Sequence, residues 1–216
     1  MIASRIKLLR SQLPEGVCLV AVSKFKPAAD IREAYEAGQR DFGENYVQEM
    51  VSKAEELPAD TRWHFIGHLQ TNKVKYIAPF VHLVHSVDSF RLLKEINKQA
   101  GNHQRVISCL LQIHIAREET KTGLTEEEFL GLLADPGLKE LNHVRLAGVM
   151  GMSTFTDDPA TVRAEFRELK NIFDKGKRFW PGMTEISMGM SGDWPLAVEE
   201  GSTMVRIGST IFGARS

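Results

Sequence analysis

The sequence predicts a single α/β domain over residues 1–216, a (β/α)8 TIM barrel with an extra N-terminal helix. Eight short apolar runs of strand length alternate with segments of helical periodicity, which is the pattern of this fold. A chain of 216 residues is long enough for one such domain. A doubly wound sheet is the competing fold, but it normally has about five or six strands and a glycine-rich phosphate turn after the first. Here the first run is followed by SKFKP, and no GxGxxG motif occurs.

The strands are expected where apolar and β-branched runs lie between turn residues. They lie near Val17, Asp41, Trp63, Val81, Val106, Val144, Thr184 and Val205. The last one is expected to be a strand over residues 203–213. In such a barrel the chemistry lies at the carboxyl ends of the strands, so the residues that follow each strand have to be considered together.

Helices are expected before and between these strands. They cover residues 1–13, 27–38, 71–78, 88–101, 125–135 and 194–201, with two more that begin near residues 45 and 158. Asn45, Asp88 and Asp193 are expected to cap the helices that they precede, because their side chains accept hydrogen bonds from free N–H groups. Thr125 and Glu128 have the spacing of a capping box.

The composition excludes several classes of protein. A hydrophobic fraction of 43% and a net charge of -1 are those of an ordinary globular protein. They do not indicate binding to nucleic acid or to an anionic membrane. Cys18 and Cys109 lie inside apolar runs, where a small buried thiol is common, so no disulfide framework or metal cluster is expected. No stretch has the length of a transmembrane helix or the core of a signal peptide, which predicts a cytoplasmic location.

Lys24 ends the first strand, directly after the apolar run VCLVAVS. A lysine that emerges half-buried from a strand loses solvation, which lowers its pKa and makes it able to attack a carbonyl and form a Schiff base. The alternative is a lysine that only extends its stem along the strand end toward water. Other residues have to decide between these two interpretations.

The loops after strands seven and eight resemble each other. In GMSGD, glycines flank Ser191 ahead of a helix, and in RIGST, Gly208 precedes Ser209 and Thr210. Free backbone N–H groups and hydroxyls of this kind bind anions, and a barrel's phosphate site is frequently built from these two loops. Two ordinary Gly/Ser turns are the alternative. A Schiff-base lysine opposite a phosphate site predicts a phosphorylated aldehyde as ligand.

Seven stretches, in order, resemble the motifs of the YggS-like pyridoxal-phosphate homeostasis proteins, single-domain relatives of the fold-type III barrel of alanine racemase. They are VAVSKFKP, FGENYVQE, WHFIGHLQTNK, ETKTG, GVMGM, ISMGMSGD and STMVRIGSTIFG. The resemblance implies that pyridoxal 5'-phosphate (PLP) is the cofactor and that Lys24 forms the Schiff base with it. It also implies that Ser191, with the backbone of Gly208 and Ser209, holds the phosphate, that Arg206 faces the pyridine nitrogen, and that Asn45 and His64 line the pocket.

Three further side chains are candidate ligands or nucleophiles. His64 and His68 lie on either side of a turn at Gly67, with no cysteine or carboxylate pair beside them, so no metal site is expected. Position 68 can be proline in such families, so a necessary role for the His68 side chain does not follow. Lys121, in the polar TKTG loop, is the second candidate lysine, although a solvated charge is the simpler interpretation.

Three functions remain open at this point. The first is a protein that holds and releases PLP in vitamin B6 homeostasis with little or no catalysis. In the racemases the second acid comes from a tyrosine of another domain, and Tyr35, Tyr46 and Tyr76 all fall in expected helices here. The second is a slow amino-acid racemase of fold type III, and the third is a Schiff-base aldolase without a cofactor. Amino acids as external aldimines and PLP-dependent apoenzymes are possible partners.

Overall fold

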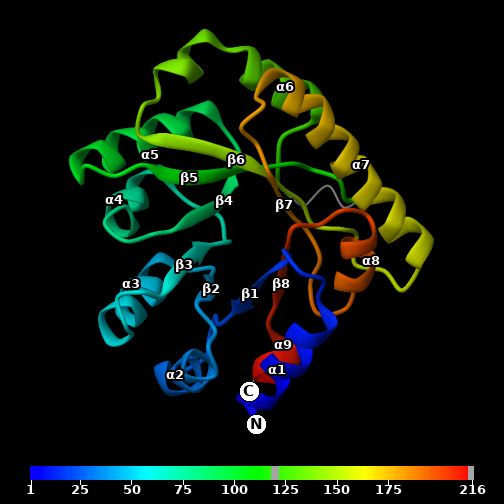
Figure 1. The fold of residues 1–216 in the computed structure, drawn as a ribbon. Helices are drawn as coiled ribbons and strands as arrows, with labels where there is room; N and C mark the ends of the chain where they lie inside the picture. Colours follow the sequence, from blue (N-terminus) through cyan, green and yellow to red (C-terminus); the bar gives the residue numbers. More distant parts are fainter. Residues whose placement is uncertain (118–121, 214–216) are drawn as a thin grey trace.

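Eight parallel strands form a closed barrel in the computed structural model of the protein, with helices around it (Figure 1). The structure describes residues 1–117 and 122–213. The strands are β1 (Cys18–Val22), β2 (Asp41–Glu44), β3 (Arg62–Phe65), β4 (Leu83–Val87), β5 (Ile107–Gln112), β6 (Val144–Met150), β7 (Glu185–Ser187) and β8 (Met204–Ile207). Each strand pairs with its neighbour in sequence, and β8 pairs with β1. The predicted (β/α)8 barrel is confirmed.

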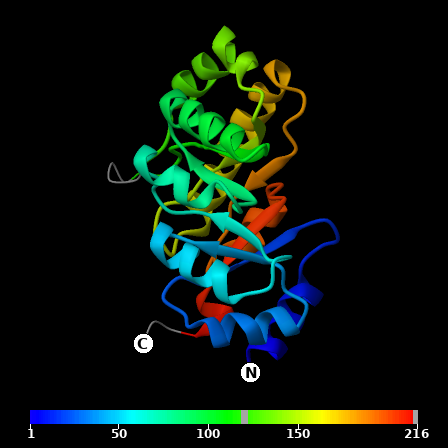
Figure 2. The same cartoon turned by 90° about the vertical axis from the view of Figure 1, so that its left-hand side faces the viewer.

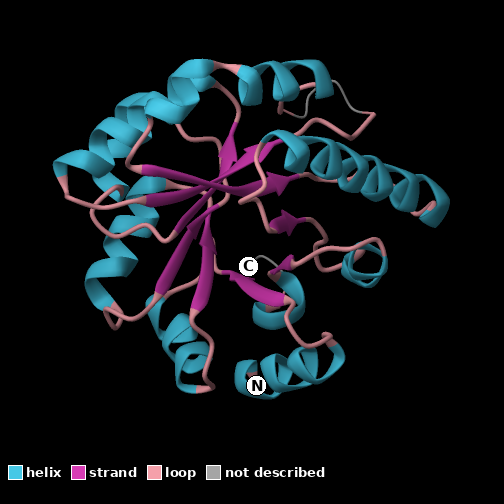
Figure 3. Cartoon of the chain, turned by 45° about the horizontal axis from the view of Figure 1, so that its top comes forward, coloured by secondary structure: helices cyan, strands magenta, loops and turns pink. Residues whose placement is uncertain are grey.

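The helices form an outer layer around the strands (Figure 3). They are α1 (Ile2–Gln12), α2 (Ala28–Glu36), α3 (Val47–Glu56), α4 (Val74–Ile77), α5 (Phe90–Asn102), α6 (Glu126–Ala134), α7 (Pro159–Phe179), α8 (Trp194–Glu199) and α9 (Ser209–Phe212), with 3-10 turns at Thr71–Lys73 and Pro136–Glu140. None of these helices combines the length and the apolar character that crossing a bilayer requires.

The main apolar core lies between the strands and the helices. On this side, residues such as Phe42, Phe65 and Phe166 are fully buried. A second and smaller apolar cluster, which includes Val20 and Leu110, comes from the opposite, inward faces of the strands. The barrel interior is therefore a packed core and not a pore.

The expected last strand is too long. β8 ends at Ile207, and α9 follows, because the N–H groups of Ile211 and Phe212 donate to the carbonyl of Gly208. The short helix carries the end of the chain back to α1, where Arg5 donates to the carbonyl of Ile211. In both views α9 lies at the same end of the molecule as α1 (Figure 2).

Two of the expected helix caps are also wrong. Tyr46 and not Asn45 occupies the N-cap of α3, with no side-chain cap, and Ser89 and not Asp88 caps α5 by accepting from the N–H of Leu92. The capping box of Thr125 and Glu128 on α6 is confirmed, with both reciprocal hydrogen bonds present.

Candidate functional site

Lys24 lies half-buried in a tight turn directly after β1. The N–H of Lys26 donates to the carbonyl of Ser23 at 3.0 Å, which closes the turn. Phe25 has a φ of 63°, a left-handed conformation that a bulky residue rarely adopts. Such conformations persist only where neighbours impose them, and they concentrate at functional sites.

Four residues around Ser23, which we call the Ser23 clamp, hold this turn in place: Ser23, Glu44, Glu49 and Lys53. The Lys53 ammonium donates to the Ser23 carbonyl (2.7 Å), Glu44 Oε1 (2.7 Å) and Glu49 Oε1 (2.6 Å). The Ser23 hydroxyl also donates to Glu44 Oε1, at 2.6 Å. Glu49 Oε1 also accepts from the N–H of Phe25, a residue outside the clamp, at 2.6 Å. The backbone on both sides of Lys24 is thus fixed by charged groups.

The Ser23 clamp is an unusual structure because its charges are buried. The Lys53 side chain is 7% exposed and that of Glu44 is 0% exposed. Burial raises the pKa of the Glu44 carboxyl, although the neighbouring Lys53 charge opposes that shift. Sequence reasoning missed this cluster. The i, i+4 spacing of Glu49 and Lys53 could have suggested their ion pair, but it would not have linked that pair to Ser23.

The loops after β7 and β8 meet at Ser191, as expected for a shared anion site. The N–H of Gly208 lies 3.3 Å from Ser191 Oγ. As in the first turn of any helix, the N–H groups of Ser209 and Thr210 have no intrahelical acceptor, and both residues are exposed. Space is open beside Gly192, where an added Cβ would meet no atom within 4 Å. These groups offer hydroxyls and N–H donors on one small surface.

Gly208 connects this candidate anion-binding surface, made by Ser191 and residues 208–210, to the strand that Lys24 follows. A Cβ at position 208 would lie 3.2 Å from the carbonyl oxygen of Val22, the last residue of β1. The pairing of β1 with β8, in which Val20 lies opposite Arg206, continues up to this point. The structure therefore brings the loop at 208–209 against the end of β1.

Asp193 holds the loop after β7 and does not cap α8 with its side chain, contrary to the expectation. Its carboxylate accepts from the N–H of Met190 at 2.6 Å and from the Ser153 hydroxyl at 2.7 Å. Gly189 in the same loop has a φ of +96°, and a Cβ there would lie 2.6 Å from the Ala197 Cβ. Glycine is therefore required for the turn that presents Ser191.

Arg206 is a buried cation at the carboxyl end of the barrel. Its guanidinium donates to Ser187 Oγ at 2.6 Å and to the carbonyl of Gly151 at 3.0 Å. Burial lowers its pKa to about 10, while the charge of Asp193 opposes this shift, so the group stays protonated at neutral pH. A guanidinium is only a donor of hydrogen bonds, so what it faces must be an acceptor.

Asn45 follows β2 at the same end of the barrel. Its Oδ1 atom is buried and has no hydrogen-bond partner among the described residues. The chain after β3 presses against it, since a Cβ at Gly67 would lie only 2.2 Å from the Asn45 carbonyl oxygen. A buried acceptor without a partner is costly unless a ligand supplies the donor.

His64 lies deeper than the sequence suggests. The ring is 1% exposed, Nε2 lies 3.0 Å from Asp41 Oδ1 and Nδ1 lies 2.9 Å from His85 Nε2. Both ring nitrogens are therefore engaged, and a direct contact of His64 with a ligand stays a prediction. His68 is exposed, with Nδ1 3.8 Å from Asp88 Oδ2. Lys121 lies outside the described residues.

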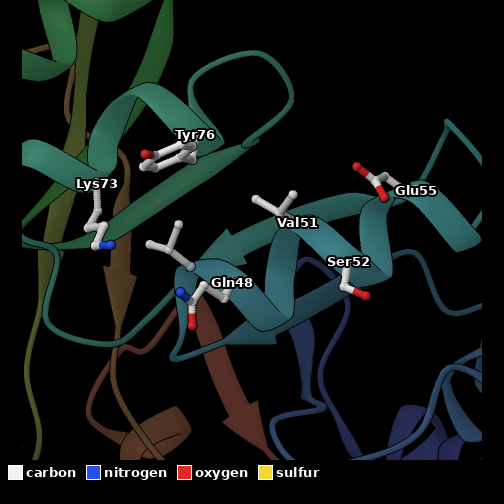
Figure 4. A pocket seen from close by; sticks show the side chains of 7 residues that line it. Gln48, Val51, Ser52, Glu55, Lys73 and Tyr76 are labelled. Atoms are coloured by element: carbon white, nitrogen blue, oxygen red, sulfur yellow. The ribbon is translucent and has the colours of Figure 1, made fainter.

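Two grooves lie between helices in the described part of the chain. One, of about 380 Å³, is lined by Gln48 and Val51 of α3 and by Lys73 and Tyr76 across from them (Figure 4). Another, of about 500 Å³, lies between Thr71 and Lys98 on α5. None of the site residues described above lines either groove.

Known proteins match the chain over its whole length. The family model "Alanine racemase, N-terminal domain" matches residues 1–216. The pyridoxal phosphate homeostasis protein of Pasteurella multocida is 40% identical over 214 residues, 95% of this chain and 90% of that protein. PipY of Synechococcus elongatus PCC7942, solved without PLP and with PLP bound, is 41% identical, with TM-scores of 0.93 and 0.90. Both alignments cover 99% of this chain and 100% of PipY.

A more distant likeness concerns the fold alone. An alanine racemase of Clostridium difficile superposes with a TM-score of 0.79 at 12% identity, over 99% of this chain and 56% of that one. This agrees with the family model and with the observed barrel. The chain therefore belongs to the YggS-like family of pyridoxal phosphate homeostasis proteins, built on the barrel of the alanine racemase N-terminal domain.

Proposed function

We propose that this protein binds PLP covalently through Lys24 and holds and releases the cofactor in vitamin B6 homeostasis, with little or no catalysis. The observation that carries the proposal is the approach of the loop at 208–209 to the end of β1, the strand that Lys24 follows. An amine and an anion-binding surface at one end of a barrel suit a phosphorylated aldehyde. Relatives named for PLP homeostasis and the PLP-bound PipY support the choice of PLP.

The described residues fit this cofactor. Ser191 Oγ and the N–H groups at 208 to 210 suit the phosphate, and Arg206 suits the pyridine nitrogen, which is an acceptor. The orphaned Asn45 Oδ1 suits a donor on the ring, such as its hydroxyl. When bound, PLP supplies an aldehyde that condenses with amines and a ring that withdraws electrons.

Little catalysis is expected because the acid and base groups are poorly placed for it. Arg206 donates a hydrogen bond but does not readily give up a proton, so it leaves the ring a weak electron sink. Tyr35 donates its hydroxyl to Asp60 and Tyr76 lines an outer groove. These contacts of the two tyrosines are with residues outside the candidate site.

A slow racemase is the second candidate, and one observation favours it. The ring of Tyr46 lies 5.3 Å from the ring of Phe25, the residue directly after Lys24. Tyr46 is therefore the tyrosine to test as a second acid. Exchange of PLP with amino acids and its delivery to PLP-dependent apoenzymes belong to the same proposal.

The visible spectrum of the purified protein with PLP tests the leading proposal. A lysine-bound cofactor absorbs in the visible range, and borohydride reduction followed by mass spectrometry locates the attachment. We expect the label on Lys24, its loss in Lys24→Ala, and its retention in the control Lys26→Ala. A label on Lys121 would move the attachment site, and no visible band would favour an aldolase without cofactor.

Catalysis is tested by incubating the PLP-loaded protein with L-alanine in deuterated water. We expect negligible deuterium uptake at Cα and negligible D-alanine, because positioned acid–base groups contribute about 10²–10⁴-fold to such reactions. Turnover on the order of 10 s⁻¹, that of a median enzyme, would make the protein a racemase. Its loss in Tyr46→Phe would then identify the second acid.

A further inference from the structure

Five polar side chains form a continuous hydrogen-bonded row through the barrel interior. Asp41 Oδ1 lies 3.0 Å from His64 Nε2, and His64 Nδ1 lies 2.9 Å from His85 Nε2. His85 Nδ1 lies 2.9 Å from Ser187 Oγ, which accepts from Arg206 at 2.6 Å. The row begins at the first residue of β2 and ends at the carboxyl end of the barrel, on β7 and β8.

We propose that Asp41, His64, His85 and Ser187 act as positioning residues for Arg206, through a hydrogen-bond chain whose protons all point from Arg206 toward Asp41. The inference rests on the proposed function, because it gives the row its purpose at the cofactor site. We call this row the interior chain.

The two ends of the interior chain fix its direction. Arg206 can only donate, and an ionised Asp41 can only accept. Ser187 Oγ accepts from Arg206, so its own proton is available for His85 Nδ1. His85 then carries its proton on Nε2 and donates it to His64 Nδ1, and His64 donates from Nε2 to Asp41. Every link has one donor and one acceptor, and neither histidine needs a charge.

The opposite direction is less favourable. His64 would donate from Nδ1 and His85 from Nδ1, which leaves the proton of Ser187 without an acceptor in the chain. His64 Nε2 would then point a lone pair at the Asp41 carboxylate, unless His64 were a buried imidazolium. Buried polar groups that lack a partner destabilise the folded protein. The proton positions of the two histidines therefore distinguish the directions.

Charge at both ends supports the same direction. Arg62 donates two hydrogen bonds to Asp41, at 2.7 Å and 2.5 Å. Burial alone would raise the pKa of Asp41, but the hydrogen bonds from His64 and Arg62 outweigh burial and lower it. Burial lowers the pKa of His85 well below its ordinary value, which keeps this ring neutral. In this direction, the accepting atom of every hydrogen bond lies on the side of its residue that faces Arg206, the buried cation.

A metal site at the amino end of the barrel is the rival interpretation of the same residues. The ligand atoms of Asp41, His64 and His82 lie within 4.8 Å of one another. In the proposed direction, His64 Nε2 donates to Asp41 Oδ1, and both oxygens of Asp41 already accept from Arg62. A metal would compete with Arg62 for the Asp41 carboxylate and would need the opposite tautomer of both histidines, so the observed hydrogen bonds favour the chain.

The direction is tested by ¹⁵N NMR of the histidine rings in the protein without PLP. We expect His64 and His85 as neutral rings that carry the proton on Nε2. In Ser187→Ala, the unprotonated Nδ1 of His85 loses its donor, so its ¹⁵N resonance should move while the Nε2 resonance stays. A proton on Nδ1 of His85, or a doubly protonated His64, would overturn the proposal.

Ser86→Ala is the matched control. Ser86 is the neighbour of His85 on β4, and its buried hydroxyl has no partner among the described residues, so it lies outside the interior chain. This variant should leave the resonances of His64 and His85 in place. Because the NMR measurement needs no cofactor, its result is independent of whether the protein binds PLP.

The positioning role is tested by the affinity for PLP and by the visible band of the loaded protein. Ser187→Ala should weaken PLP binding about tenfold and shift the visible band, because Arg206 loses the hydrogen bond to Ser187 that positions it. The tenfold figure corresponds to the loss of one hydrogen bond to a charged group. Ser187→Thr, which keeps the hydroxyl, should restore both, and Ser86→Ala should change neither. An unchanged affinity and band in Ser187→Ala would overturn the role, even with the expected NMR result.

Discussion

At the residue scale, single side chains in the loop after β7 determine which groups the candidate anion-binding surface offers to a ligand. Ser191 is presented by a glycine turn, and its oxygen lies within reach of the Gly208 N–H. Neither group is charged, so their contribution depends on a ligand that brings negative charge to them. Hydrogen bonds to a charged group contribute about 1.5–3 kcal/mol, more than those between neutral groups.

Ser191→Ala should weaken the binding of PLP more than that of unphosphorylated pyridoxal. The loss of one charge-assisted hydrogen bond corresponds to roughly one to two decades in affinity for PLP. Spectroscopic titration of both ligands on both proteins measures the difference. Equal losses for the two ligands would show that Ser191 does not contact the phosphate.

The residues at strand ends were predictable from sequence, whereas their partners were not. Lys24, Ser191 and Gly208 follow apolar runs, and the barrel rule brings such positions together. The partners of His64 lie at positions 41 and 85, on the strands before and after its own. On a short strand of a barrel, inward-facing and outward-facing positions are both largely apolar. The sequence therefore does not show which residues of a strand face the barrel interior.

At the scale of elements, the Ser23 clamp joins β1, β2 and α3 through charges. The hydrogen bonds from Lys53 connect the helix to the backbone of Ser23 and to Glu44 on β2. Breaking a buried ion pair by removing one partner costs about 3–5 kcal/mol, because the remaining charge stays buried. The turn that carries Lys24 and the stability of the barrel therefore depend on the same contacts.

Lys53→Met should lower the free energy of unfolding by about 3–5 kcal/mol and weaken PLP binding, since the turn at residues 23–25 loses its support. Urea unfolding measures the first effect and spectroscopic titration the second. Lys7→Met, at an exposed lysine of α1, is the control and should change neither. The double variant Lys53→Met/Glu44→Met should be more stable than Lys53→Met alone, because the fully buried Glu44 carboxylate is then no longer left without its cation. The remaining carboxylate, Glu49, is 22% exposed and still accepts from the N–H of Phe25.

The helix ends show why local patterns predict some elements better than others. The capping box at Thr125 needs only residues three apart, and it is present. Asn45 has the sequence of a cap, but α3 begins at Val47 and its N-cap is Tyr46, so the Asn45 side chain does not cap the helix. A local pattern thus failed where tertiary contacts and a candidate site overlap.

At the scale of the whole molecule, the fold was predictable because alternation of strands and helices is repeated eight times along the chain. The end of β8 was not, since apolar and β-branched residues stand on both sides of Gly208, which alone marks the change to α9. Burial of histidines was not predictable either. These buried histidines make the stability of the barrel depend on pH in a way that the composition does not show.

Acidification should destabilise the barrel between about pH 6.5 and about pH 4. Burial lowers the pKa of His85, which is 0% exposed, well below its ordinary value. His82 is exposed, but partial desolvation of its ring and the neighbouring His64 lower its pKa from 6.5 to about 4. In this window the unfolded chain binds protons that the folded protein excludes, so stability is fully present above pH 6.5 and falls with pH. The pKa of Asp41 is lowered too, so its contribution is lost only at more acidic pH.

Urea unfolding at about pH 7.5 and about pH 4.5 measures this loss. In His82→Asn the difference between the two free energies of unfolding should be smaller than in the unchanged protein, because one excluded proton is gone. His82 lies at the amino end of the barrel, outside the interior chain, so this variant leaves Arg206 and its hydrogen bonds in place. The same difference in both proteins would contradict the prediction.

β1 and β8 lie side by side in the barrel although they come from opposite ends of the sequence, with Leu19 paired to Val205. During synthesis, Lys24 leaves the ribosome long before Gly208 and Ser209 are added. A nascent chain therefore carries Lys24 without the candidate phosphate loops and without the strand that pairs with β1. Under the proposed function, only molecules that already contain β8 and α9 take PLP from the cellular pool, and a chain stalled before these two elements would leave that pool untouched.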